Sequence, residues 1–174
     1  MQVNKKFKRI QNDWYIEPAF CIEALIENIK FTGDIHDPCC GEGNIPKITS
    51  GTGSDIVDRA NGKYPVVNFL NDKTQRDNII TNPPYRITVN IVTHALKYVK
   101  NKVAVIVPLG FLASLKRFDF FCLTPVDEVL IMSHRPSMPP GGTPIKLGKG
   151  STDYCWIVWN NSKLENKPTI RWIV

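Results

Sequence analysis

The stretch DIHDPCCGEGN, residues 34–44, contains the features that decide the fold class of this chain. Residues 34–37 have the pattern of a short strand, which Pro38 ends. Gly41 and Gly43 follow at once, and glycines at a strand-to-helix turn let the backbone approach a ligand closely. Because ligands of open α/β sheets bind outside the carboxyl ends of the strands, this stretch predicts both such a sheet and its ligand site.

The same turn excludes two common phosphate-binding motifs. Pro46 stands where the dinucleotide fingerprint G-x-G-x-x-G requires its third glycine, and the sequence contains no G-x-x-x-x-G-K-[ST] loop. Asp55, at the end of the next predicted strand, offers carboxylate oxygens to both hydroxyls of a ribose. Together these residues indicate a nucleoside cofactor without a diphosphate.

The rest of the chain alternates between strand and helix patterns. Apolar spacing predicts helices over residues 17–30, 89–99 and 111–123, and strands over residues 34–37, 54–57, 66–70, 78–81, 102–107, 128–132, 154–159 and 170–174. Residues 44–54 leave room for about two helical turns at most, so the helix after the glycine-rich turn is expected to be short. This order favours an open α/β sheet with helices on both faces. We expect a single domain, residues 13–174, after a flexible basic segment, residues 1–12.

Composition sets limits on location and partners. The chain has 174 residues, a net charge of +6 and 5 cysteines. The charge permits a polyanionic partner. The odd number of cysteines, without a secretory signal, predicts reduced thiols and a cytoplasmic protein, and no pair has the spacing of a metal site. The longest apolar run, residues 103–113, is shorter than the roughly 20 residues of a membrane helix, so no membrane association is expected.

A second motif, Asn82-Pro83-Pro84-Tyr85, follows the predicted strand over residues 78–81. Its prolines stiffen the chain, so that the backbone carbonyl of Pro83 can project as a rigid acceptor. The Asn82 carboxamide supplies a second acceptor, and Tyr85 supplies an aromatic face for stacking. Two acceptors beside such a platform suit a planar amine. Holding both amine hydrogens draws the nitrogen lone pair out of conjugation and directs it at an electrophile.

With these two motifs in this order, the sequence resembles the S-adenosylmethionine-dependent amino-methyltransferases that carry an N-P-P-Y motif. It is most similar to small adenine-N6 DNA methyltransferases of phage and prophage type. The resemblance covers roughly residues 13–174. It implies a Rossmann-like class I methyltransferase fold, which is a mostly parallel seven-stranded sheet with helices on both faces. It also implies S-adenosyl-L-methionine as the cofactor.

The resemblance assigns roles to particular residues. The catalytic motif is matched by Asn82, Pro83, Pro84 and Tyr85, and the cofactor-binding positions by Pro18, Asp37, Pro38, Gly41, Gly43, Asp55, Asn68 and Phe69. Asn68 stands where the family usually has aspartate, although its side-chain carbonyl can still accept from the cofactor's adenine. Residues 15–18, Tyr-Ile-Glu-Pro, resemble the segment that closes over the methionine end of the cofactor, where the family more often has Thr-Pro.

The substrate is less closely defined than the chemistry. Arg86, Arg135 and Lys146 are the candidates for nucleic-acid contacts, because phosphate contacts dominate affinity for DNA and RNA. The loop over residues 135–142 could lie over the substrate as a lid. DNA is favoured over RNA, and a partner protein could supply sequence specificity because the length leaves no room for a recognition domain. Two alternatives stay open: methylation of an RNA base or a protein glutamine, and a non-catalytic binding module with this fold.

Overall fold

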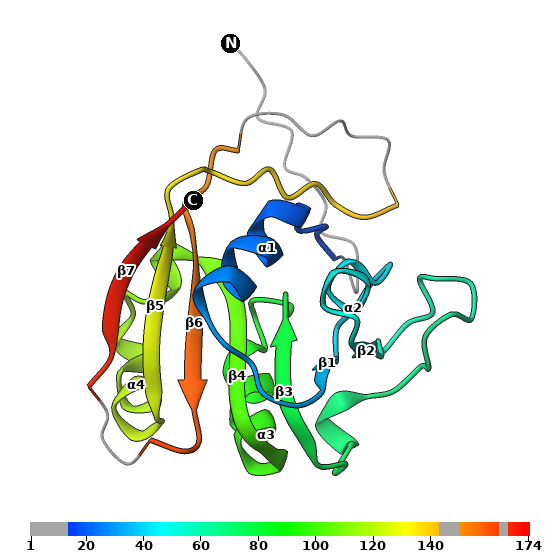
Figure 1. Ribbon diagram of the computed structural model, residues 1–174, viewed down its shortest axis with the longest axis horizontal. Helices are drawn as coiled ribbons and strands as arrows, with labels where there is room; N and C mark the ends of the chain where they lie inside the picture. The colour runs from blue at the N-terminus through cyan, green and yellow to red at the C-terminus, as the bar shows by residue number, and fades with distance from the viewer. Residues whose placement is uncertain (1–13, 143–149, 164–166) are drawn as a thin grey trace.

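The computed structural model describes residues 14–142, 150–163 and 167–174, which form a seven-stranded sheet in the order β2-β1-β3-β4-β6-β5-β7 (Figure 1). The strands are β1 (Ile35–Asp37), β2 (Thr52–Gly53), β3 (Arg76–Thr81), β4 (Val99–Pro108), β5 (Val126–Met132), β6 (Tyr154–Asn160) and β7 (Thr169–Ile173). Four of the six neighbouring pairs are parallel, and β6 runs antiparallel to both of its neighbours. The predicted mostly parallel seven-stranded sheet is therefore confirmed.

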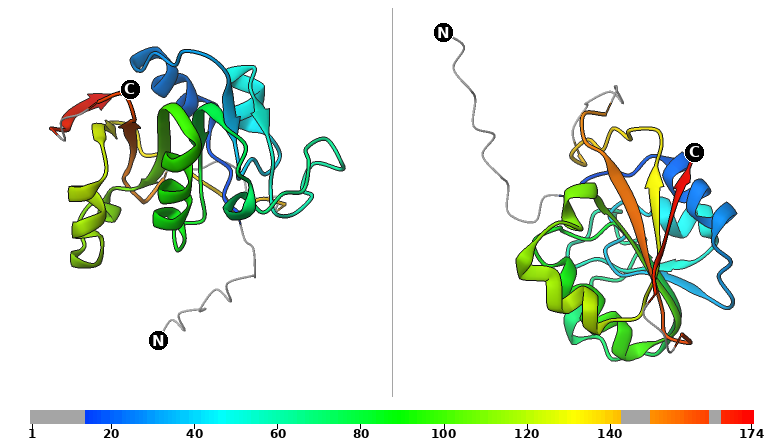
Figure 2. Two further views of the ribbon diagram at one scale, coloured as in Figure 1. Left: turned by 90° about the horizontal axis from the view of Figure 1, so that it is seen from below. Right: turned by 90° about the vertical axis from the view of Figure 1, so that its left-hand side faces the viewer.

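Helices cover both faces of the sheet (Figure 2). They are α1 (Ala19–Asn28), α2 (Asn44–Thr49), α3 (Thr88–Tyr98) and α4 (Phe118–Leu123). The apolar sides of α1 and α2 pack on one face, and those of α3 and α4 pack on the other. Helix α2 has 6 residues, so the prediction of a short helix after the glycine-rich turn is confirmed.

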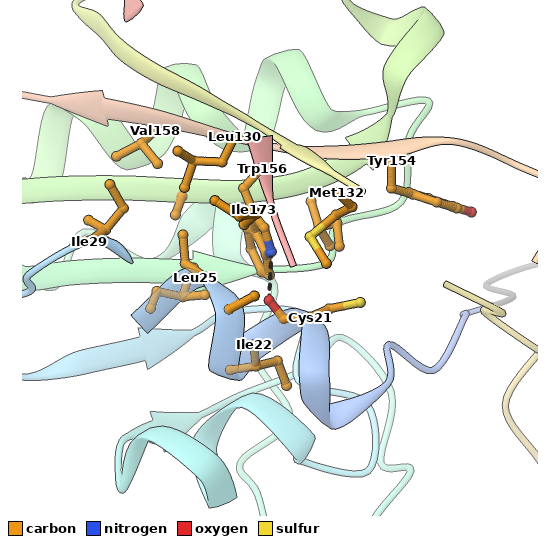
Figure 3. Close-up of a cluster of buried hydrophobic side chains, with 14 of the residues drawn as sticks. Cys21, Ile22, Leu25, Ile29, Leu130, Met132, Tyr154, Trp156, Val158 and Ile173 are labelled. Atoms are coloured by element: carbon orange, nitrogen blue, oxygen red, sulfur yellow. Dashed lines mark hydrogen bonds between the residues drawn. The ribbon is translucent and has the colours of Figure 1, made fainter. Parts of the chain in front are cut away.

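The core is built on β4, whose central residues 103–107 are all 0% exposed. An uninterrupted apolar run of this kind is expected of a strand buried on both faces. Trp156 and Trp159 of β6 are also fully buried, on opposite faces of the sheet. Trp156 joins the sheet to α1, because its indole nitrogen donates to the carbonyl oxygen of Cys21 at 2.8 Å (Figure 3).

Two predicted strands are wrong in detail. The strand expected over residues 54–57 lies earlier, as β2, where Thr52 pairs with His36. The strand expected over residues 66–70 is reduced to one parallel bridge between Asp55 and Val66. Asn68 explains the second difference, because its side-chain oxygen accepts from the backbone nitrogen of Leu70 at 3.1 Å and starts a 3-10 turn instead of a ladder.

The helix expected over residues 111–123 is broken into short turns. Two 3-10 turns, Leu109–Phe111 and Leu115–Arg117, precede α4. Ser114 has an extended backbone, with φ −162° and ψ 127°, and so prevents a continuous helix. None of the helices in the described part of the chain is long and apolar enough to cross a membrane.

Candidate active site

Two loops meet at one end of the sheet, because β1 and β3 are parallel neighbours. The first follows Asp37 at the end of β1, and the second follows Thr81 at the end of β3. Between these loops and the chain before α1 lies a hollow. It is lined by Trp14, Tyr15, Ile16, Glu17, Cys39, Cys40, Gly41, Glu42, Asn44 and Asn82. The structure thus brings the two sequence motifs and residues 14–17 into one site.

The loop after β1 has the backbone conformation that its glycines permit. Gly41 and Gly43 have positive φ values of 53° and 89°. The side chain of Asp37 accepts from the backbone nitrogen of Cys39 at 3.0 Å, which fixes the start of the loop. The predicted need for glycine at these positions is therefore met by the left-handed backbone that side chains disfavour.

Asp55 holds this loop in place from the neighbouring strand. Its carboxylate accepts from the backbone nitrogens of Gly41 at 2.9 Å and Val57 at 3.1 Å, and it lies 3.5 Å from the Arg59 guanidinium. The side chains of Asp55 and Arg59 are both about nine-tenths buried. Asp55 thus lies beside the glycine-rich loop, and its carboxylate binds the backbone of that loop.

Asn82 stands at the centre of the polar contacts in the hollow. Its amide nitrogen donates to the carbonyl oxygen of Tyr15 at 2.9 Å and to Oε2 of Glu17 at 3.0 Å. Its side-chain oxygen accepts from the Tyr85 hydroxyl at 3.3 Å. The Tyr85 hydroxyl also contacts Sδ of Met138, at 3.7 Å. The carboxamide is therefore held with its nitrogen toward residues 15–17 and its oxygen toward Tyr85.

Acidic groups dominate the electrostatics of the site. Burial raises the pKa of Glu17 from 4.5 to about 7. Burial also raises the pKa of Asp37 well above its ordinary value, and the nearby charge of Glu17 adds to this. Burial likewise raises the pKa of the Cys40 thiol to about 12, so that this cysteine stays protonated at neutral pH. Burial thus favours the neutral forms of these groups, and a cationic ligand beside them would favour the ionised carboxylates.

The chain before α1 is tied to the loop after β5. The backbone nitrogen of Ile16 donates to the carbonyl oxygen of Pro139 at 2.9 Å, and that of Gly141 donates to the carbonyl oxygen of Trp14 at 2.9 Å. Tyr15 and Pro140 form an antiparallel bridge between these two segments. The second half of the loop predicted as a lid therefore lies against residues 14–16, beside the hollow.

The other predicted residues fall in several places. Phe69 is buried in the core beneath its 3-10 turn, edge-on to His94, and Asn68 is exposed at the start of that turn. Arg86 is exposed directly after the Asn82 motif. Arg135 is also exposed, and its guanidinium donates to Asp153 at 2.6 Å. Lys146 and residues 1–12 lie outside the described residues. The described residues contain no group of three His, Cys, Asp or Glu arranged to hold a metal ion.

Sequence reasoning missed three residues of the site. Trp14 lies over the loop after β1, and the guanidinium of Arg59 stacks on its ring at 3.9 Å. Asn44 donates to the carbonyl oxygen of Glu17 at 3.1 Å and so fixes residues 14–17 from the start of α2. No local pattern marks Trp14 or Arg59, because their contacts depend on a fold that brings distant segments together. Asn44 could have been identified from the sequence, because it directly follows Gly43 of the glycine-rich loop.

Comparisons with known proteins identify the fold. No protein-family model and no curated protein sequence matches the chain. Among solved structures, the methyltransferase subunit of a type I restriction-modification system from Streptococcus thermophilus has a TM-score of 0.62 and 12% identity, over 93% of this chain and 48% of that one. The M protein of the type I restriction enzyme EcoKI has a TM-score of 0.61 and 12% identity, over 86% of this chain and 44% of that one.

A third similar structure is a SAM-dependent O-methyltransferase from Thermotoga maritima, with a TM-score of 0.53 and 12% identity over 83% of this chain and 66% of that one. These likenesses, together with the sheet order, show that the chain has the Rossmann-like class I methyltransferase fold. The chain spans less than half the length of the two restriction-system subunits, at 48% and 44%.

Proposed function

We propose that this chain is an S-adenosyl-L-methionine-dependent methyltransferase that acts on an exocyclic amino nitrogen, adenine N6 in DNA. The observation that carries the proposal is the placement of the Asn82 carboxamide. It lines the same hollow as the glycine-rich loop, and its oxygen is turned away from the amide's two acceptors. An acceptor for an amine thus lies beside the expected binding site of the methyl donor.

The residues of the hollow fit this cofactor. The loop after Asp37 would lie along it, and Asp55 would reach the ribose from the end of β2. The indole N–H of Trp14 is buried without an acceptor in the described part of the chain, and so suits a ligand that carries oxygens. A cationic group bound beside Glu17 and Asp37 would stabilise the ionised forms of these carboxyls. When bound, the cofactor supplies a methyl group on a positively charged sulfonium sulfur.

The protein's own groups would then hold and orient the substrate amine. Oδ1 of Asn82 and the carbonyl oxygen of Pro83 accept its two N–H hydrogens. The ring of Tyr85 packs against the flat face of the base, and the hydroxyl of Tyr85 stays close to Asn82. Two fixed acceptors in one plane leave the nitrogen lone pair directed out of that plane, without a general base before attack.

Nucleic acid is the favoured substrate on three grounds. The net charge is +6, Arg86 is exposed directly after the Asn82 motif, and two of the similar structures are methyltransferase subunits of type I restriction systems. Arg135 is exposed in the loop after β5. An enzyme that acts on a base must extract it from the duplex or use a single strand. We further propose that a partner protein contributes sequence specificity and that the chain belongs to the phage or prophage type.

Radiolabelled S-adenosylmethionine tests the proposal when it is incubated with duplex DNA, single-stranded DNA, RNA and cell protein in parallel. Label in DNA that co-elutes with N6-methyladenine is the expected result. Label in RNA or in protein glutamine would keep the chemistry and change the substrate. Cofactor binding without transfer to any of the four, with a cell extract added to supply partners, would favour the non-catalytic alternative.

A further inference from the structure

The Asn82 side chain donates both of its amide hydrogens in hydrogen bonds to acceptors that are fixed in place. One goes to the backbone carbonyl of Tyr15 at 2.9 Å, and the other to the Glu17 carboxyl at 3.0 Å. A carbonyl oxygen and an ionised carboxylate can only accept hydrogen bonds. The reversed carboxamide would place its oxygen against two acceptors, so these contacts select one orientation of Asn82.

Glu17 is held rigidly enough to make this selection. It is 7% exposed. Its backbone carbonyl accepts from Asn44 at 3.1 Å, and the preceding Ile16 donates to Pro139 at 2.9 Å. The next residue, Pro18, is the N-cap of α1. Segments on two sides therefore fix the backbone at Glu17, and burial restricts its side chain, in contrast to a surface glutamate, which samples many rotamers.

We propose that Glu17 is a positioning residue for methyl transfer, which holds the Asn82 carboxamide with its oxygen toward the substrate nitrogen. The inference rests on the proposed function, because the orientation has meaning only if an amine binds there. An amine brings N–H hydrogens to the site. An oxygen at this position accepts them, whereas the reversed amide would oppose them with its own N–H groups.

The ionisation state of Glu17 determines whether a single orientation of the Asn82 carboxamide is favoured. A carboxylate enforces it, whereas a protonated carboxyl can also donate to Asn82 and so tolerates the reversed amide. Burial raises the pKa of Glu17 to about 7. The titratable groups that face it are Asp37 at the end of β1, Cys21 on α1, Cys40 in the loop and Tyr85 after β3. Transfer is therefore expected to rise with pH through about 7.

Steady-state kinetics of three variants test the inference. Glu17→Ala should lower kcat by about tenfold or more while the KM for the cofactor changes by less than about twofold. Glu17→Gln can donate as well as accept, as the protonated carboxyl does, so its kcat should lie between those of wild type and Glu17→Ala and should not vary with pH near 7. The exposed Glu23→Gln on α1 is the matched control and should behave as wild type.

The outcomes separate this inference from the proposed function. A Glu17→Ala enzyme with unchanged kcat would overturn the positioning role, and so would a variant in which only the KM for the cofactor rises, since Glu17 would then be a cofactor ligand. If the wild-type protein transfers no methyl group to any substrate, the proposed function is overturned. The positioning role of Glu17 in methyl transfer is then overturned as well.

A second measurement does not depend on activity. The side-chain amide resonances of Asn82, assigned by their loss in Asn82→Ser, should shift with pH around 7 in wild type and stay constant in Glu17→Gln. Resonances that do not titrate in wild type would overturn the contact between Glu17 and Asn82.

Discussion

At the scale of single residues, Asp55 shows how one side chain serves both the fold and the site. It is 7% exposed, and its two oxygens accept from the backbone nitrogens of Gly41 and Val57. Sequence pattern placed an acidic residue at the end of a strand and predicted a ligand role. The bonds to the loop could not be foreseen, because they depend on how closely β1 and β2 approach.

Asp55→Ala should therefore weaken cofactor binding and stability together. The loss leaves two backbone N–H groups without their acceptor, which should cost about 1–3 kcal/mol in the free energy of unfolding. The dissociation constant of the cofactor should rise about tenfold, which corresponds to 1.4 kcal/mol. Urea denaturation and calorimetric titration measure the two effects. Lys73→Ala, a change at an exposed position outside the site, is the control, and an equal effect of both variants would contradict this account.

His36 joins β1 to β2, because its ring nitrogens contact the hydroxyls of Thr52 at 2.8 Å and Ser54 at 3.1 Å. Burial lowers the pKa of His36 from 6.5 to about 4, and the nearby charge of Arg76 adds to this. The folded chain therefore binds a proton at His36 less tightly than the unfolded chain does. The stability due to this group is complete above pH 6.5 and is lost as pH falls through about 4.

Wild type should consequently lose more stability than His36→Gln between pH 6.5 and 4, by up to about 3 kcal/mol. Urea unfolding at several pH values measures the difference. His134→Gln, at an exposed position, should keep the wild-type pH dependence. If the free energy of unfolding changes equally with pH in wild type and His36→Gln, then His36 does not contribute this pH dependence.

At the scale of elements, the strands and helices that follow strong sequence patterns were predicted correctly. The long buried run of β4 and the apolar periodicity of α3 identify those elements because each has one dominant pattern. Residues 66–70 were assigned wrongly because β-branched residues suggest a strand, whereas the Asn68 side chain favours a turn. The end of β3 and the loop after β1 carry the two motifs, so the core of the candidate site could be predicted from the sequence.

Gly43 tests the turn between β1 and α2. Its φ of +89° disfavours any side chain, and a Cβ there would lie 2.2 Å from the Tyr64 hydroxyl oxygen. Gly43→Ala should cost about 1–2 kcal/mol from the left-handed backbone, and more from the contact with Tyr64. Gly62→Ala is the matched control, because its φ is +77° and a Cβ there would meet nothing within 4 Å.

Thermal unfolding and cofactor titration of both variants provide the measurement. Gly43→Ala should be the less stable variant and should bind cofactor more weakly. Gly62→Ala should lose only the free energy of unfolding that the left-handed backbone costs. Equal losses in both variants would mean that the close packing at Gly43 contributes nothing.

At the scale of the whole molecule, Trp156 connects the centre of the sheet to α1, which leads directly from residues 14–17 of the site. Its bond to Cys21 joins positions 135 residues apart. The sequence predicted both elements but could not predict this contact, since nothing in a local pattern pairs two such distant positions. The same limit explains why Trp14 and Arg59 were missed.

Trp156→Phe should lower the free energy of unfolding by about 1–3 kcal/mol, because the buried carbonyl of Cys21 loses its donor. Trp172→Phe, at an edge position that is 70% exposed, should change it by less than about 0.5 kcal/mol. Chemical denaturation of both variants measures the difference. Similar values for the two variants would contradict the central role given to Trp156.

The central claim is that Asn82 presents an acceptor to an amine beside a bound methyl donor. Its most direct test compares wild type with Asn82→Ala, using DNA incubated with S-adenosylmethionine and then digested to nucleosides for mass spectrometry. The account predicts N6-methyladenine from wild type and at least about a hundredfold less from Asn82→Ala. Cofactor affinity and melting temperature should stay nearly unchanged. Equal yields from the two proteins, or a variant that has lost cofactor binding as well, would contradict the role assigned to Asn82.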